Sequence, residues 1–239
     1  ADSSSVMLPK GALQRGDNRR LRGEDLTQGL PALMKGQIIT PAAAGLLASL
    51  GLAKVKVYRK LKVAYFSTGD EILSLGEDPK EGAVYDSNRY TVHGLLQQLG
   101  CEMIDMGVVK DDPALLEQAF IQAAQSADAV ITSGGVSVGE ADHTKSVMQS
   151  LGDISFWKLA IKPGRPLAAG WVRRPAAQAD ADTHAAQPAR ADEADRIPFF
   201  GLPGNPVAAF VTFKAIVEPC LQKLAGVTLH VRPDRKSVV

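Results

Sequence analysis

The feature that most constrains this chain is a regular alternation of apolar, strand-like segments with amphipathic, helix-like segments, which begins at Lys60. A short apolar run over 63–67 comes first. A helical pattern over 88–99 follows it, with apolar residues spaced three and four apart. Because parallel strands need a crossover connection, usually a helix, this alternation predicts an α/β fold: a mostly parallel sheet with helices on both faces.

The expected elements follow one another to the end of the pattern. We expect strands over 63–67, 103–109, 128–133, 154–161, 167–172 and 199–202, and helices over 88–99, 113–126, 141–151 and 206–224. One face of the helix over 113–126 carries Leu116, Ala119, Phe120 and Ala123. That face is predicted to pack on the sheet, since an apolar stripe of this kind is buried in globular proteins.

Two segments depart from the alternation. Glycines punctuate residues 1–58, where apolar runs over 30–34, 37–39 and 55–58 predict short strands beside a helix over 42–50. We therefore expect a small, incomplete β-rich unit before the α/β domain. Residues 175–196 hold nine alanines and no Val, Ile, Leu, Met or aromatic residue. Such a composition cannot build a core, so it predicts a disordered insertion between two strands.

Composition excludes several classes of partner. The chain has 27 basic and 26 acidic residues, without the clustered basic surplus that nucleic-acid binding needs. No segment approaches the roughly 20 apolar residues that span a bilayer, so a membrane partner is not expected. Neither Cys101 nor Cys220 lies in a CxxC pair. This favours a reducing compartment, and we expect the cytoplasm.

Four motifs stand where predicted strands end, and ligands of open α/β sheets bind outside the carboxyl ends of strands. The first is Ser67-Thr68-Gly69-Asp70-Glu71. Its glycine allows a tight turn, and its two acids offer oxygen ligands for a divalent cation. A solvated turn is the alternative.

The second motif is Ser133-Gly134-Gly135-Val136-Ser137-Val138-Gly139, between a strand and a helix. Backbone N–H groups and hydroxyls of such a loop can converge on a phosphate, helped by the helix N-terminus. It is neither a Walker loop nor a GxGxxG loop. Asp142 follows this loop closely and could bind a metal ion. An acid in the first turn of a helix is also explained by the helix dipole alone. The metal-binding interpretation of Asp142 therefore depends on other acids lying nearby.

The third and fourth motifs follow the later strands. The third motif holds three cations close together, and Pro163 and Gly164 stand between the last two; its basic residues are Lys158, Lys162 and Arg165. This spacing predicts a site that binds an anion. A solvated surface strand is the alternative. The fourth is Pro203-Gly204-Asn205-Pro206. There the asparagine can cap a helix that begins at the second proline, although a pure turn role remains open.

In this order, the four motifs resemble those of the molybdopterin-binding domain shared by adenylyltransferases and molybdenumtransferases of molybdenum-cofactor synthesis. The resemblance covers about residues 60–226. An upstream Arg-Gly-Glu-Asp segment ending at Asp25 resembles the molybdopterin molybdenumtransferase family, of the MoeA and gephyrin E-domain type. Asp111-Asp112-Pro113 and the Gly139–Asp142 segment are similar to that branch as well.

The resemblance implies a transferase that inserts molybdate into adenylated molybdopterin, with Mg²⁺ as cofactor and release of AMP. The active-site residues that it implies are Asp25, Glu71, Asp111, Asp142, Lys158 and Lys162. Of these, Glu71, Asp111 and Asp142 would bind the metal, and the lysines would bind molybdate. The implied molybdopterin-binding residues are Thr68, Gly69, Asp70, Ser133, Gly134, Gly135, Val136, Ser137, Gly139, Pro163, Gly164, Arg165, Pro203, Gly204, Asn205 and Pro206.

Chains of this family are longer, with a further N-terminal domain and a C-terminal β-domain. The resemblance therefore implies a fragment: a partial linker domain over 1–58, the molybdopterin-binding domain over 59–226, and the start of the β-domain over 227–239. It also implies a homodimer and a contact with molybdopterin adenylyltransferase. Two alternatives stay open: an adenylyltransferase that uses ATP, and a non-catalytic, gephyrin-like scaffold module.

Overall fold

A computed structural model of the chain describes residues 7–135, 147, 149–174 and 196–228. The chain forms two compact units that divide between Val55 and Lys56. Most of the helix expected over 141–151 and most of the segment over 227–239 lie outside the described residues. The insertion expected at 175–196 lies outside them as well, except for Arg196, which is the first residue of a strand and not part of a loop.

The first unit contains turns and a helix, α1 (Pro41–Ser49), which the sequence predicts. The Thr40 hydroxyl accepts a hydrogen bond from the amide of Ala43, as a helix-capping side chain does. The expectation of a β-rich unit is wrong for the described residues, which form no strand before Lys62. Strands are stable only beside other strands, and the apolar runs expected to form them lie exposed, as at Leu30 and Val57.

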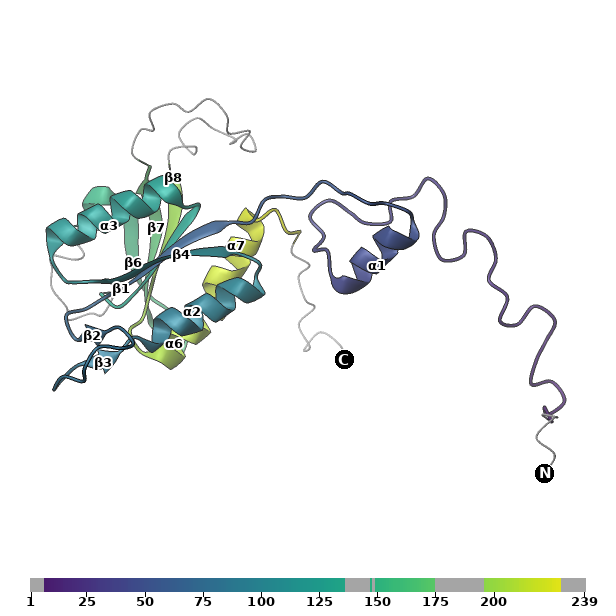
Figure 1. Ribbon diagram of the computed structural model, residues 1–239, viewed down its shortest axis with the longest axis horizontal. Helices are drawn as coiled ribbons and strands as arrows, with labels where there is room; N and C mark the ends of the chain where they lie inside the picture. The colour runs from purple at the N-terminus through teal and green to yellow at the C-terminus, as the bar shows by residue number, and fades with distance from the viewer. Residues whose placement is uncertain (1–6, 136–146, 148, 175–195, 229–239) are drawn as a thin grey trace. The chain divides into compact units, whose positions relative to one another are not determined.

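The second unit is built on a six-stranded sheet in the order β4-β1-β5-β8-β7-β6 (Figure 1). Its strands are β1 (Lys62–Thr68), β4 (Glu102–Val109), β5 (Ala129–Ser133), β6 (Gly152–Lys158), β7 (Pro166–Arg173) and β8 (Arg196–Leu202). β4, β1, β5 and β8 are parallel neighbours. β7 is antiparallel to both β8 and β6, so among these strands it alone runs in the opposite direction. The prediction of a mostly parallel sheet is confirmed.

The helices also agree with the sequence pattern. They are α2 (Ser87–Gln98), α3 (Pro113–Ser126), α6 (Pro206–Thr212), the π-helical η1 (Phe213–Val217) and α7 (Glu218–Leu224). The last three replace the single helix expected over 206–224. The pattern did not predict the small parallel pair of β2 (Ile72–Leu73) and β3 (Val84–Tyr85), whose strands are too short to show a period.

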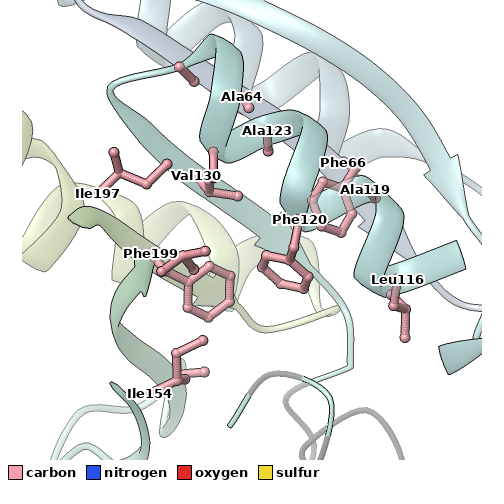
Figure 2. Packing of buried hydrophobic residues seen from close by; sticks show 14 residues of the cluster. Ala64, Phe66, Leu116, Ala119, Phe120, Ala123, Val130, Ile154, Ile197 and Phe199 are labelled. Carbon is pink, nitrogen blue, oxygen red and sulfur yellow. The ribbon is translucent and has the colours of Figure 1, made fainter. Parts of the chain in front are cut away.

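α3 covers one face of the sheet and packs against an aromatic core (Figure 2). The ring of Phe120 lies edge-on to Phe66 and Phe199, with centroid separations of 5.2 and 5.3 Å. Burial of each such ring contributes about 1.5–3 kcal/mol. All four residues predicted to face the sheet from this helix are buried, as expected.

The other face of the sheet is covered by α2 and the segment from α6 to α7. Val63 and Tyr65 of β1 and Ile131 of β5 pack there with Leu96 and Phe213. Because β1 is covered on both faces, nearly every residue in it is buried, as is typical of a central parallel strand. None of the helices in the described ranges is long and apolar enough to cross a membrane.

Candidate functional site

The candidate site lies at the edge of the sheet where β1, β4, β5, β6 and β8 end. From β1 the chain continues to β4 on one side and then to β5 on the other, so a topological switch point lies at β1. Connections diverge at such a point and leave a crevice outside the carboxyl ends of the strands. All four sequence motifs begin at this edge, because every strand that precedes one runs in the same direction.

The loops after β1 and β5 are in close contact through Gly134, whose φ is +89°. A Cβ atom at this position would stand 2.3 Å from the carbonyl oxygen of Thr68 and 3.0 Å from its Oγ1. No side chain fits there. The amide of Gly134 also donates to the carbonyl oxygen of Leu202, at 3.2 Å, which joins this loop to the end of β8.

Beneath these loops, three buried hydroxyls hold the ends of β1 and β5 together. The Tyr65 hydroxyl is 2.9 Å from Ser67 Oγ and 2.8 Å from Ser133 Oγ, and the two serine oxygens are 3.2 Å apart. Each hydroxyl can donate once and still accept, so the ring closes with every proton used. Burial, and secondarily the nearby Asp86 carboxylate, raises the pKa of Tyr65 well above its usual value. The phenol therefore stays protonated.

The loop after β8 starts α6 as the sequence predicts. The Asn205 side chain accepts from the amide of Ala208 at 3.1 Å, and Pro206 is the first helical residue. The Asn88 side-chain amide donates to the carbonyl of Gly204 at 2.8 Å and so ties this loop to the start of α2. The amides at the start of α6 thus lie at the same edge as the loops after β1 and β5.

The loop between β6 and β7 packs on α6. The amide of Leu159 donates to the carbonyl of Arg165 at 2.6 Å, which closes the loop. Gly164 is buried, and a Cβ there would meet Thr212 Oγ1 at 2.7 Å. Lys158, Lys162 and Arg165 are exposed. The structure therefore brings the loop of the third motif onto the helix that the fourth motif starts, with its basic side chains in solvent.

The acids of the first motif meet the loop after β4. Asp70 Oδ1 accepts from the amide of Asp111 at 3.4 Å. The carboxylate of Glu71 folds back over Gly69, with Oε2 2.7 Å from the place a Cβ would take. All three acids are exposed. The described residues contain no group of three or more His, Cys, Asp or Glu that could hold a metal. Asp142, the third expected ligand, lies outside them, as do Val136, Ser137 and Gly139.

Asp25 belongs to the first unit. Its carboxylate pairs with the guanidinium of Arg20, and the nearby Glu24 side chain accepts from the amide of Leu21 at 2.7 Å. These contacts make a tight local turn with exposed side chains. A role for Asp25 in the site stays a prediction.

Several polar residues at this edge were not predicted. Tyr65 was interpreted only as part of a strand, and Ser67 as the start of the first motif without its bond to Tyr65, although a tyrosine and a serine on one face of a buried strand signal a polar cluster. Asp86 caps α2 through a 3.1 Å bond from the amide of Arg89 to its Oδ1. An aspartate directly before a segment with a helical pattern was the signal available in the sequence.

Unpartnered polar atoms concentrate at this edge. Within the described residues, six buried side-chain atoms lack a hydrogen-bond partner. Four belong to residues of this edge or its loops and helices: Thr68 Oγ1, Asp86 Oδ2, Asn88 Oδ1 and Thr212 Oγ1. Thr132 Oγ1 lies in β5, and Arg174 Nε lies at the opposite end of the sheet, after β7. Buried polar atoms are almost always bonded, and leaving one unpaired costs about 1–3 kcal/mol. The gathering of the first four atoms around the loops of the motifs marks this edge as a place where partners come from a bound molecule or a further segment of chain.

Several known proteins resemble this chain in sequence. A family model described as a probable molybdopterin binding domain matches residues 64–223. The molybdopterin molybdenumtransferase of Haemophilus influenzae is 46% identical over 222 residues, which are 93% of this chain and 50% of that protein. The enzyme of the same name from a Nostoc species is 36% identical over 212 residues, 88% of this chain and 44% of that protein.

A solved structure is similar as well. The molybdopterin biosynthesis moea protein from Pyrococcus horikosii superposes with a TM-score of 0.67 at 34% sequence identity, over 85% of this chain and 45% of that chain. This chain thus spans about half the length of the curated relatives it matches.

Proposed function

Because the chain belongs to the molybdopterin-binding domain family, we propose that it acts as part of a molybdopterin molybdenumtransferase. The reaction inserts molybdate into adenylated molybdopterin, releases AMP and forms molybdenum cofactor. One observation carries the proposal: the loops of Thr68, Gly134 and Gly204 adjoin at one edge of the sheet, with buried polar atoms unpartnered around them.

The phosphate of the pterin substrate is assigned to the loops after β5 and β8. The loop after β5 approaches Thr68 so closely that only glycine fits at position 134. The amides at the start of α6 carry the positive end of the helix dipole toward the same edge. Backbone N–H groups of these loops would bind an anion without a buried charged side chain.

Molybdate is assigned to Lys158 and Lys162. Both are exposed at the carboxyl end of β6, on a loop held against α6 by the buried Gly164. Ammonium groups act as compact point charges, which suits a small oxyanion without a fixed planar shape.

Mg²⁺ is assigned to Glu71, Asp111 and Asp142. The exposed carboxylates of the first two come from adjoining loops, and oxygen ligands of this kind fit a hard divalent cation. When bound, the ion would offset charge on the phosphoanhydride. Asp25 is proposed as a further catalytic residue. The proposal also places the protein in the cytoplasm as a homodimer that contacts molybdopterin adenylyltransferase.

The test is a two-dimensional titration of molybdate against Mg²⁺, with AMP release from adenylated molybdopterin as the signal. Lys162→Ala should raise the molybdate concentration for half-maximal turnover, and Asp142→Asn should raise the Mg²⁺ concentration. Lys223→Ala, which removes an exposed lysine of α7, is the control. If both variants shift both dependences equally, the division between lysines and acids is wrong.

The same assay distinguishes the alternatives. An adenylyltransferase would form adenylated molybdopterin and pyrophosphate from molybdopterin and ATP. A scaffold module would bind molybdopterin without releasing AMP under any of these conditions. Either result would replace the transferase proposal.

A further inference from the structure

We propose that Asp86 and Asn88, at the start of α2, recognise the hydrogen-bond donors on the pyrimidine edge of the bound pterin. They would thereby set the specificity of the site for that heterocycle. The inference rests on the proposed function and names the part of the substrate that these two residues read.

Both side chains are buried, yet each keeps a free acceptor. Asp86 is 4% exposed and Asn88 is 6% exposed. Asp86 uses Oδ1 to cap α2, by accepting from the amide of Arg89. Its Oδ2 has no partner among the described residues. A carboxylate oxygen buried in this way is costly unless a donor reaches it.

The orientation of the Asn88 amide is fixed by its neighbour. The carbonyl oxygen of Gly204 can only accept, so the Asn88 atom 2.8 Å from it must be the NH₂ nitrogen. The opposite atom, Oδ1, is therefore an acceptor, and it too lacks a partner among the described residues. Two acceptors two residues apart thus await donors.

These acceptors adjoin the loops of the proposed site. Asn88 contacts Gly204, and a Cβ on Gly204 would come within 4.0 Å of the Gly134 Cα. Gly134 in turn touches Thr68. Asp86 is the N-cap of the same helix, two residues before Asn88. The start of α2 therefore adjoins the loops after β1, β5 and β8.

The chemistry of a pterin matches these acceptors. Its pyrimidine edge carries two donors side by side, the 2-amino group and the ring N3–H. Adenine, the other heterocycle of the adenylated substrate, presents an amino group beside an acceptor nitrogen. Phosphate and molybdate oxygens are acceptors with negative charge, which a carboxylate repels. A site built to bond a substrate N–H strongly rejects an analogue that lacks it, because its own polar groups are then left unpaired.

The test uses two small probes, 6-hydroxymethylpterin and 6-hydroxymethyllumazine. The second has a carbonyl oxygen in place of the 2-amino group. Asp86→Asn keeps the size of the side chain and its capping oxygen, since asparagine caps helices about as well as aspartate. It replaces the free acceptor with an NH₂ donor.

Binding of each probe to the whole chain is measured by NMR, with AMP as a third ligand. Wild type should prefer the pterin over the lumazine by about tenfold or more, the range for a hydrogen bond to a charged group. Asp86→Asn should lose that preference and leave AMP affinity unchanged. Asp112→Asn is the matched control, because Asp112 caps α3 with bonds to the amides of Ala114 and Leu115.

Three results would overturn the inference. One is a wild-type protein that binds both probes equally, which needs no variant to be folded. Another is an unchanged preference in Asp86→Asn. The last is binding of AMP without either probe, which would leave the proposed function standing. A wild-type protein that binds neither AMP, nor the probes, nor molybdopterin would instead overturn the proposed function, and this inference with it.

Discussion

Gly134 is the position where one added carbon atom tests the site most directly. Gly134→Ala would place a Cβ 2.3 Å from the Thr68 carbonyl oxygen, in a backbone conformation with positive φ. We expect the loops after β1 and β5 to move apart and molybdopterin affinity to fall at least tenfold. A left-handed backbone conformation alone costs a non-glycine residue about 1–2 kcal/mol. The free energy of unfolding of Gly134→Ala should fall by more than this amount.

Gly100→Ala is the control for this variant. Gly100 also has positive φ, at +72°, but a Cβ there meets nothing within 4 Å. Gly100→Ala should therefore lower the free energy of unfolding by the backbone cost alone and leave molybdopterin affinity unchanged. Calorimetric titration measures molybdopterin affinity, and urea unfolding measures the free energy of unfolding. Equal molybdopterin affinity in Gly134→Ala and Gly100→Ala would contradict a role for the close approach of Gly134 to Thr68.

Asp128 lies at the opposite end of β5 from the site and links it to the start of β1. Its carboxylate accepts two bonds of 2.6 Å from Arg59 and one of 2.8 Å from the amide of Lys62. Burial by itself would raise the pKa of Asp128, but these bonds outweigh it and the pKa is lowered. The interaction therefore stabilises the fold above the unfolded-state pKa of about 3.9 and is lost as the pH falls through the folded-state pKa.

Asp128→Asn should lower the free energy of unfolding at pH 7 by about 1–2 kcal/mol, a modest figure because Arg59 is largely exposed. The difference from wild type should shrink as the pH falls through the lowered folded-state pKa of Asp128. Urea unfolding at several pH values measures it. A difference that is constant with pH would show that packing, and not charge, is responsible.

Single residues were predictable where their partners are close in sequence. Asn205 was expected to cap α6 because its partner is three residues away. The role of Asn88 was not predictable, since its partner Gly204 is 116 residues distant and only the sheet brings them together. Tyr65 was missed for the same reason: Ser133 lies on a different strand.

Elements follow the same rule. α3 was predicted at its observed bounds because Asp112, Pro113 and its apolar stripe are all local signals. The prediction of strands before Lys62 is wrong, at 30–34, 37–39 and 55–58. A strand depends on a neighbouring strand, and the local sequence does not reveal whether one is present. The loops after β1, β5 and β8 were predicted as a site because parallel strands end at a common edge; Asp142 and Gly139 lie outside the described residues, so their place stays a prediction.

The β7–β8 pair predicts where the chain tolerates a deletion. Arg173 and Arg196 are register partners at the ends of these antiparallel strands, so a short turn can join them. Replacing Ala176–Asp195 by Gly-Ser should change the free energy of unfolding by less than about 0.5 kcal/mol, as for surface changes. Molybdopterin binding should also be kept, because β8 enters the sheet at this end and reaches the site at the other. A loss above about 2 kcal/mol would show that the segment packs on the fold.

At the scale of the whole molecule, buried side chains are unevenly shared between the two units. Apart from Ala43, the buried hydrophobic residues within the described ranges lie between Leu61 and Leu221. We expect hydrogen exchange of the intact chain to follow this division. Amides of β1, β5 and β8 should exchange only through global unfolding, whereas those of residues 7–55 should exchange at far lower free energy. Equal protection in both units would contradict it.

The sheet order also has a consequence for how the protein is made. β8 lies between β5 and β7, and it follows both of them in the chain. While the polypeptide is being synthesised, β1, β4 and β5 can pair before β8 has left the ribosome, since N-terminal parts fold first. The crevice has neither its third loop nor the start of α6 until β8 is inserted. Under the proposed function, a partly translated chain would not bind a pterin, and occupancy of the site would report that β8 is in place.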